Sequence, residues 1–144
     1  MTMTGSRSRL DRSSTYIVVV GLLLYLGSFV LPAFKDGDDP IRGIVAFLLA
    51  LDTSRGSPLA WSANPLLWAG LILGARGSPG AGAATAAFGV VTGTAGVAAW
   101  LPSTQGQYMT PAIGVYLWLA SMALVAAGCA TRWFTRQSLA SVEG

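Results

Sequence analysis

The side chains that could do chemistry in this chain are few, and the densest group lies between residues 35 and 39. There Asp36, Asp38 and Asp39 surround a glycine. Carboxylate oxygens are ligands that calcium prefers, but this run is shorter than a helix–loop–helix calcium loop and lacks its final glutamate. We therefore expect a solvated turn here rather than a metal site.

The composition excludes the commonest catalytic arrangements. The chain has no histidine and a single cysteine, Cys129. It therefore lacks the usual general base and imidazole ligand, and it cannot form an intrachain disulfide or a CxxC pair. Its glycines form neither a GxGxxG motif nor a phosphate-binding loop with a lysine. The sequence predicts no catalytic residue, no metal and no cofactor, and hence a protein that is not an enzyme.

An amide beside a proline is the most informative single polar feature. Asn64 and Pro65 lie inside an apolar stretch that runs over residues 58–75. Proline cannot donate to the carbonyl four residues earlier, that of Trp61, and a carbonyl without a donor is costly in lipid. The Asn64 side chain could satisfy backbone groups freed by Pro65, or it could face a ligand or partner. We favour the structural role and expect Asn64 to face the bundle interior.

The elements that must position these residues are membrane helices. Of the chain, 53% is hydrophobic and 10% is charged, whereas soluble domains carry about 25% charged residues. No charged residue occurs between Arg76 and Arg132, and about 20 apolar residues suffice to cross a hydrocarbon core. The predicted fold class is therefore all-α, a polytopic protein surrounded by the lipid bilayer.

Four transmembrane helices are predicted within one domain that covers residues 15–131. Their expected ranges are 16–32, 58–75, 81–101 and 111–130. The basic start of the chain also fits a signal peptide, but Leu31-Pro32-Ala33 is a poor cleavage site, so we favour an uncleaved first helix.

Three further segments are predicted, one within this domain and one on each side of it. A short helix over residues 40–51, capped by Asp39 and beginning at Pro40, is too short to cross, and it is expected to be interfacial or re-entrant. Residues 1–14 read as a disordered basic arm, and residues 132–144 as a polar cytoplasmic tail.

Charge bias predicts the orientation. Lys and Arg are more frequent on cytoplasmic segments. Six basic residues fall on the side of the two termini, at positions 7, 9, 12, 76, 132 and 136, and three fall on the other side, at 35, 42 and 55. Both termini are therefore expected in the cytoplasm. An aromatic belt is expected from Trp61, Trp100 and Tyr108 at the outer boundary and from Tyr16 and Trp133 at the inner one.

Small residues form a stripe along the third predicted span. Successive members are separated by four or three residues, which places them on one helix face; they are Gly82, Ala86, Gly89, Gly93 and Gly96. A glycine inside a helix costs about 1 kcal/mol relative to alanine, and in lipid the compensation is close approach of two backbones. The stripe could form a dimer interface, but we favour packing within the monomer.

Three short strings carry a resemblance to a known group. LPAF (31–34), WSANPLLWAG (61–70) and GVYLWLAS (114–121) resemble strings in small, uncharacterised bacterial four-span membrane proteins. The resemblance implies a multi-pass protein of the bacterial cytoplasmic (inner) membrane and supplies no activity. It covers only these three strings.

The function expected from these features is non-enzymatic. No predicted span contains an ionisable Asp, Glu, Lys, Arg or His, and such groups usually accompany proton-coupled transport. No block of like charges indicates nucleic acid binding. We expect a protein that acts through helix packing or through association with a membrane-protein partner or a second copy of itself. The alternative is a small-molecule carrier or pore for neutral solutes.

Overall fold

The computed structural model describes residues 4–51, 57–100 and 109–143. Within these residues the chain forms helices joined at one end by short strands. In chain order they are α1 (Thr4–Val30), β1 (Pro32–Asp36), β2 (Asp39–Arg42), α2 (Gly43–Leu51), α3 (Pro58–Ala75), α4 (Pro79–Trp100), β3 (Met109–Pro111) and α5 (Ile113–Glu143).

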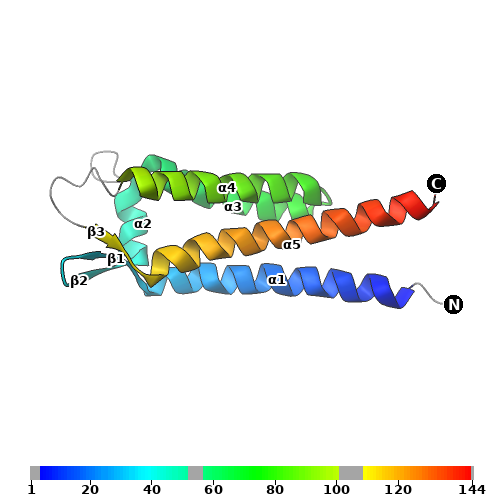
Figure 1. Cartoon of the computed structure of the whole chain (residues 1–144), viewed down its shortest axis with the longest axis horizontal. Helices are drawn as coiled ribbons and strands as arrows, with labels where there is room; N and C mark the ends of the chain where they lie inside the picture. The colour runs from blue at the N-terminus through cyan, green and yellow to red at the C-terminus, as the bar shows by residue number, and fades with distance from the viewer. Residues whose placement is uncertain (1–3, 52–56, 101–108, 144) are drawn as a thin grey trace.

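The long helices α1, α3, α4 and α5 lie side by side, and α2 crosses one end of the bundle (Figure 1). α3 and α4 are antiparallel, because Gly96 of α4 lies against Ala60 near the start of α3, whereas Gly82 lies against Gly74 near its end. Between them Gly77 adopts a positive φ of 95°, a conformation that glycine accepts without strain. α3 has the bounds that the sequence predicted.

α1 and α5 form the second antiparallel pair. Gly128 in the second half of α5 lies against Ser14 and Val18 of α1, and Gly21 lies against Ser121. The Arg132 guanidinium donates to the hydroxyls of Ser14 (2.9 Å) and Thr15 (2.7 Å).

Both ends of the chain differ from the prediction. The segment 1–14 was predicted to be disordered, yet α1 begins at Thr4, and the predicted tail 132–144 is helical through Glu143. Extending an existing helix is far easier than nucleating one. The polar composition of these segments did not reveal that continuity.

A three-stranded antiparallel sheet caps the bundle and was not predicted by an all-α assignment. Its strand order is β2-β1-β3, with Lys35 opposite both Pro40 and Thr110. The helix expected over 40–51 therefore begins at Gly43, because Asp39–Arg42 pairs with β1. Likewise the last helix begins at Ile113, after β3. Pro40 and Pro111, at which these two helices were expected to begin, therefore lie in strands.

Three helical segments are long and apolar enough to cross a membrane within the part of the chain described. They are Arg12–Val30, Pro79–Trp100 and Ile113–Ser138. α3 is not among them; it carries Ser62, Asn64 and two prolines within its 18 residues. The predicted end of the third span at residue 101, and Tyr108 and Arg55, lie outside the described residues.

Candidate functional site

Asn64 repairs the gap that Pro65 leaves in α3. Ser57 caps this helix by accepting a hydrogen bond from the Ala60 N–H at 3.2 Å. Further along, Pro65 has no N–H for the Trp61 carbonyl. The Asn64 Nδ2 donates to that carbonyl at 3.0 Å. The side chain next to the defect thus supplies the missing donor.

The other end of the Asn64 amide joins three helices. Its Oδ1 accepts from the Tyr25 hydroxyl of α1 at 3.1 Å and from the Trp118 Nε1–H of α5 at 2.9 Å. Asn64 is 5% exposed, so it faces the bundle interior, as the sequence predicted. Because α1 and α3 meet here mainly through side chains, this network and the Tyr25–Trp68 ring contact (centroids 6.0 Å apart) connect them.

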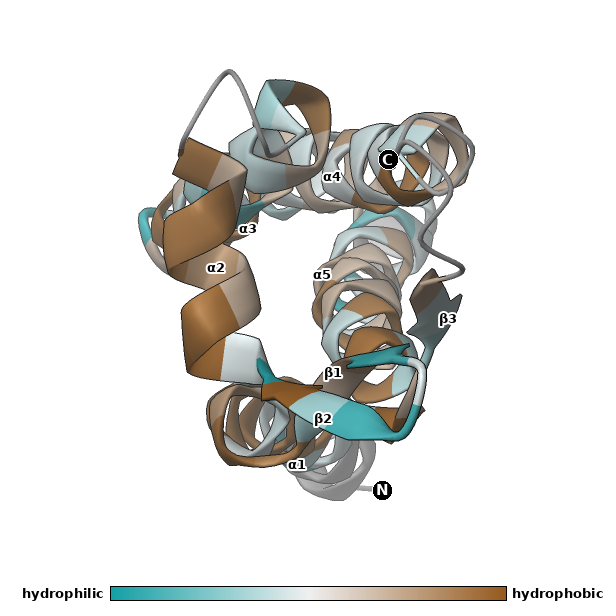
Figure 2. Cartoon of the chain, turned by 90° about the vertical axis from the view of Figure 1, so that its left-hand side faces the viewer, coloured by the Kyte–Doolittle hydropathy of each residue, from teal (hydrophilic) through white to brown (hydrophobic). Residues whose placement is uncertain are grey.

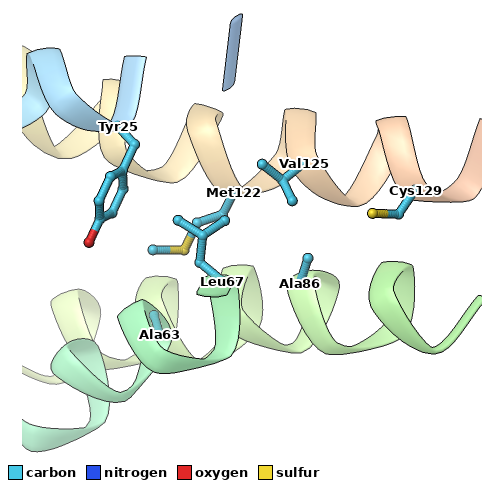
Figure 3. Packing of buried hydrophobic residues seen from close by; sticks show 7 residues of the cluster. All are labelled: Tyr25, Ala63, Leu67, Ala86, Met122, Val125 and Cys129. Carbon is cyan, nitrogen blue, oxygen red and sulfur yellow. The ribbon is translucent and has the colours of Figure 1, made fainter. Parts of the chain in front are cut away.

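Below this network lies the main apolar core. Figure 3 shows Tyr25 of α1 and Met122, Val125 and Cys129 of α5 facing Ala63 and Leu67 of α3 and Ala86 of α4. Leu67, Met122 and Val125 are fully buried. Close packing of this kind fixes helix positions in lipid, where burial from water contributes little between helices. The core therefore holds the Asn64 network in place.

Beside Asn64 lies a cavity of about 80 Å³. All four long helices, α2 and β1 contribute to its wall. No charged side chain lines it. Its aromatic residues are Phe29, Phe34, Phe47, Trp61, Trp100 and Trp118.

Ring contacts hold the cavity wall together. Phe29 of α1 meets Phe47 of α2 edge-on with centroids 5.4 Å apart, and Phe47 lies 6.4 Å from Trp61. On the opposite side Phe34 meets Trp100 at 4.7 Å. Edge-to-face aromatic pairs stabilise in addition to their buried area. The wall therefore depends on contacts between α2 and its neighbours as well as on the long helices.

Two residues expected at the outer membrane boundary also line this cavity. Trp61 and Trp100 were assigned to an outer aromatic belt, and both contribute to the cavity wall. Tyr16 and Trp133, expected at the inner boundary, are 69% and 38% exposed. The sequence gives the positions of Trp61 and Trp100 along their helices. The direction in which their indoles point also depends on their ring contacts with β1 and α2.

The small-residue stripe of α4 lies against α3 within the monomer. Gly82, Ala86, Gly89, Gly93 and Gly96 are all buried. A Cβ on Gly82 would stand 2.7 Å from the Gly70 carbonyl oxygen, and one on Gly96 would overlap the Ala60 backbone. The stripe is therefore occupied by an intramolecular contact and is not free to form a dimer face.

The acidic residues lie at the far tip of the β1–β2 hairpin. Gly37 turns the chain with a φ of 60°, Asp36 pairs with Asp39, and both Asp38 and Asp39 are exposed. In the described residues no three potential metal ligands form a cluster. The turn is separate from the Asn64 cavity.

The sequence reasoning missed Tyr25, Trp118 and the cavity itself. A tyrosine or tryptophan in the middle of a span carries a donor that needs an acceptor, which is the signal that could have linked them to Asn64. No local signal in the sequence indicated that β1 and α2 contribute to the wall of the cavity.

Comparison of the chain with known proteins yields no assignment: no family model matches it, and neither does a curated protein or a solved structure.

Proposed function

We propose that the chain crosses the membrane four times. In this proposal α3 crosses as well as the three helical segments that are long and apolar enough to do so. α1 and α4 are parallel, since each is antiparallel to α5. The contacts of α1 with α5 described above show this for the first pair. For the second pair, Gly80 near the start of α4 lies against Trp133, and Gly93 near its end lies against Leu119. After α1 reaches the sheet end, the chain must return before α4 can cross in the same direction. α3 packs along α4 and supplies that return. The two ends of the chain lie at the same end of the bundle (Figure 1), which supports an even number of crossings.

We place both termini in the cytoplasm. Arg132 donates to Ser14, two residues from Arg12, and Arg136 donates to the carbonyl of Gly77, next to Arg76. These arginines therefore lie together at the end of the bundle that holds the termini, and the β1–β2 hairpin lies at the other end (Figure 1). Excess basic residues mark the cytoplasmic side. The resemblance of three short strings to bacterial four-span proteins suggests the bacterial cytoplasmic membrane.

Reporter fusions test this orientation. Fusions after Gly5 and after Gly144 should both report the cytoplasm, and a fusion within residues 102–108 should report the outside. Opposite reports from the two termini would mean an odd number of crossings. In that case α3 would not span the membrane.

As its activity we propose non-enzymatic binding of a small neutral solute in the Asn64 cavity, as a carrier or receptor. One observation carries this: the wall of the cavity contains aromatic rings and a fixed amide but no charged group. An uncompensated charge would be strongly disfavoured in such a site. Pockets of this kind, apolar with few polar groups, are typical of small-molecule sites.

A ligand series should show this selectivity. Acetone at ten times its Kd should raise the free energy of unfolding by about 1.4 kcal/mol, whereas isopropylammonium and acetate should not. Thermal unfolding in detergent measures the effect. In Ala46→Leu, which fills the cavity, the stabilisation should disappear, while Ala98→Leu on the exposed face of α4 should retain it. Equal stabilisation by charged and neutral compounds would exclude this function.

A second candidate is association with a membrane-protein partner. Figure 2 shows α2 as apolar along nearly its whole length. Ile44, Val45, Leu48 and Leu51 are all 45–58% exposed. Photo-crosslinking from Leu48 to another protein, together with no ligand effect on stability, would favour this candidate over solute binding.

A further inference from the structure

A second hollow, the α4–α5 groove, lies on the surface of the bundle between these two helices. It is an open groove of about 740 Å³. Small residues form most of its wall, from Gly80 to Ala87 on α4 and from Ala126 to Ala130 on α5, and Trp133 and Phe134 complete it. No charged side chain lines it, and it shares no lining residue with the Asn64 cavity. The groove is therefore a separate apolar surface.

The α4–α5 groove extends into the depth of one membrane leaflet. Both of its helices contain segments that are long and apolar enough to cross a membrane. From Phe134 back to Ala126, α5 covers about 12 Å at 1.5 Å per residue. This is most of the ~15 Å that one leaflet contributes to a hydrocarbon core of ~30 Å. The groove thus has the length over which an acyl chain runs through a leaflet.

Two arginines lie at the end of the groove where the polar part of α5 begins. The Arg136 guanidinium, two residues beyond Phe134, donates to the Gly77 carbonyl at 2.8 Å. Arg76 precedes Gly77 in the chain and is exposed. A guanidinium has five N–H donors, so Arg136 can bind an anion while it keeps this hydrogen bond. α4 begins just beyond, at Pro79, and a helix N-terminus also favours negative charge.

No acidic side chain that the structure describes lies at this end of the bundle. Those that it describes are Asp36, Asp38 and Asp39, on the β1–β2 hairpin at the other end (Figure 1). Arginine binds phosphate through parallel hydrogen bonds. An apolar groove with a cationic end therefore complements a molecule that has an acyl chain and an anionic phosphate head.

We propose that the α4–α5 groove binds an anionic phospholipid of the leaflet on the side of the chain termini. One acyl chain lies along the small residues, and the phosphate accepts hydrogen bonds from Arg136 and Arg76. The adjacent rings of Trp133 and Phe134, with centroids 4.8 Å apart, lie at the headgroup level, where aromatic side chains are enriched. Basic pockets between membrane helices bind anionic headgroups in this way. The site is independent of solute binding in the Asn64 cavity.

Fluorine NMR of the full chain in nanodiscs tests the preference for an anionic lipid. The five tryptophans, labelled as fluorotryptophan, give separate signals, and Trp133→Phe assigns the signal from the groove. Phosphatidylglycerol and phosphatidylcholine that carry the same nitroxide on the acyl chain are compared at equal fractions of the bilayer. The phosphatidylglycerol label should broaden the Trp133 signal at least about fivefold more strongly. Both labels should broaden Trp68, which is 46% exposed on α3, to the same extent.

Two arginine variants separate a site from general attraction to a basic surface. Arg136→Gln should lower the preference of Trp133 for the phosphatidylglycerol label about fivefold. Arg12→Gln removes the same charge from the same end of the bundle, but α1 does not line the groove, so the preference should stay as in the parent. Equal losses in the two variants would mean diffuse attraction and would overturn the site.

Two alanine variants test the position of the acyl chain. Ala127 and Ala123 are both exposed on α5, but only Ala127 lines the groove. Ala127→Leu should reduce the phosphatidylglycerol effect on Trp133 to the level of phosphatidylcholine, whereas Ala123→Leu should retain it. An unchanged preference in Ala127→Leu would place the lipid elsewhere.

Two further results contradict the proposal. One is equal broadening of Trp133 by the two lipids in the parent chain. The other is disulfide crosslinking of Ala84→Cys between two copies without any lipid preference, which would assign the groove to a dimer.

Discussion

Replacing Gly96 with alanine is expected to lower the free energy of unfolding by about 3 kcal/mol, at the upper end of the usual cost of overpacking. A methyl group there would overlap the backbone N of Ala60 and stand 2.6 Å from its Cα. A backbone cannot turn aside as a side chain can, so α3 and α4 must separate. Their separation loses contacts along both helices, and lipid offers no compensating gain. Denaturant titration in detergent micelles measures the change.

Gly27→Ala is the matched control. Nothing lies within 4 Å of the position that its Cβ would occupy, and alanine is favoured over glycine in a helix by about 1 kcal/mol. This variant should be as stable as the parent or more stable. Gly89→Leu and Gly93→Leu should both destabilise more than Leu71→Ala. Parent-like stability of Gly96→Ala would show that α3 and α4 do not pack through this stripe.

Asn64→Leu should lower the free energy of unfolding by about 2–3 kcal/mol. The substitution leaves the Tyr25 hydroxyl, the Trp118 N–H and the Trp61 carbonyl without their partner. Single interhelical hydrogen bonds in membranes contribute about 0.6 kcal/mol on average, with a maximum near 1.7, and unsatisfied groups cost more. Ser62→Ala should change stability by less than about 0.5 kcal/mol, because that hydroxyl donates only to its own helix, at Leu59.

Pro65→Ala isolates one part of this cost. An alanine at 65 has an N–H that can donate to the Trp61 carbonyl in place of the Asn64 amide. The double variant Asn64→Leu/Pro65→Ala should therefore be more stable than the sum of the two single changes implies. Strict additivity, or equal stability of Asn64→Leu and Ser62→Ala, would mean that the amide does not serve this carbonyl.

Much of the helical architecture follows from local properties. The length of an apolar stretch sets whether it can cross a membrane, and the spacing of small residues sets which face allows close approach. Both are visible along a single helix, which is why the bounds of α3 and the stripe from Gly82 to Gly96 could be predicted. The need of the Trp61 carbonyl for a donor is equally local, since Pro65 creates it and Asn64 stands next to it.

The sheet could not be predicted in the same way. β1 pairs with β3, which lies beyond two intervening long helices, and strand pairing depends on such distant partners more than on local propensity. Pro40 and Pro111 resemble first residues of helices when seen alone. In the fold they pair with Lys35 and Phe34 of β1.

By itself the sequence determined an apolar helical protein, the close-packing face of α4 and an interior Asn64, because chain length, residue spacing and proline chemistry act within one helix. Only the tertiary structure decided that Tyr25 and Trp118 meet Asn64. It alone decided that β1 and α2 complete a neutral cavity. The physical reason is that a cavity is the space left among elements, and its shape depends on how they pack rather than on any one of them.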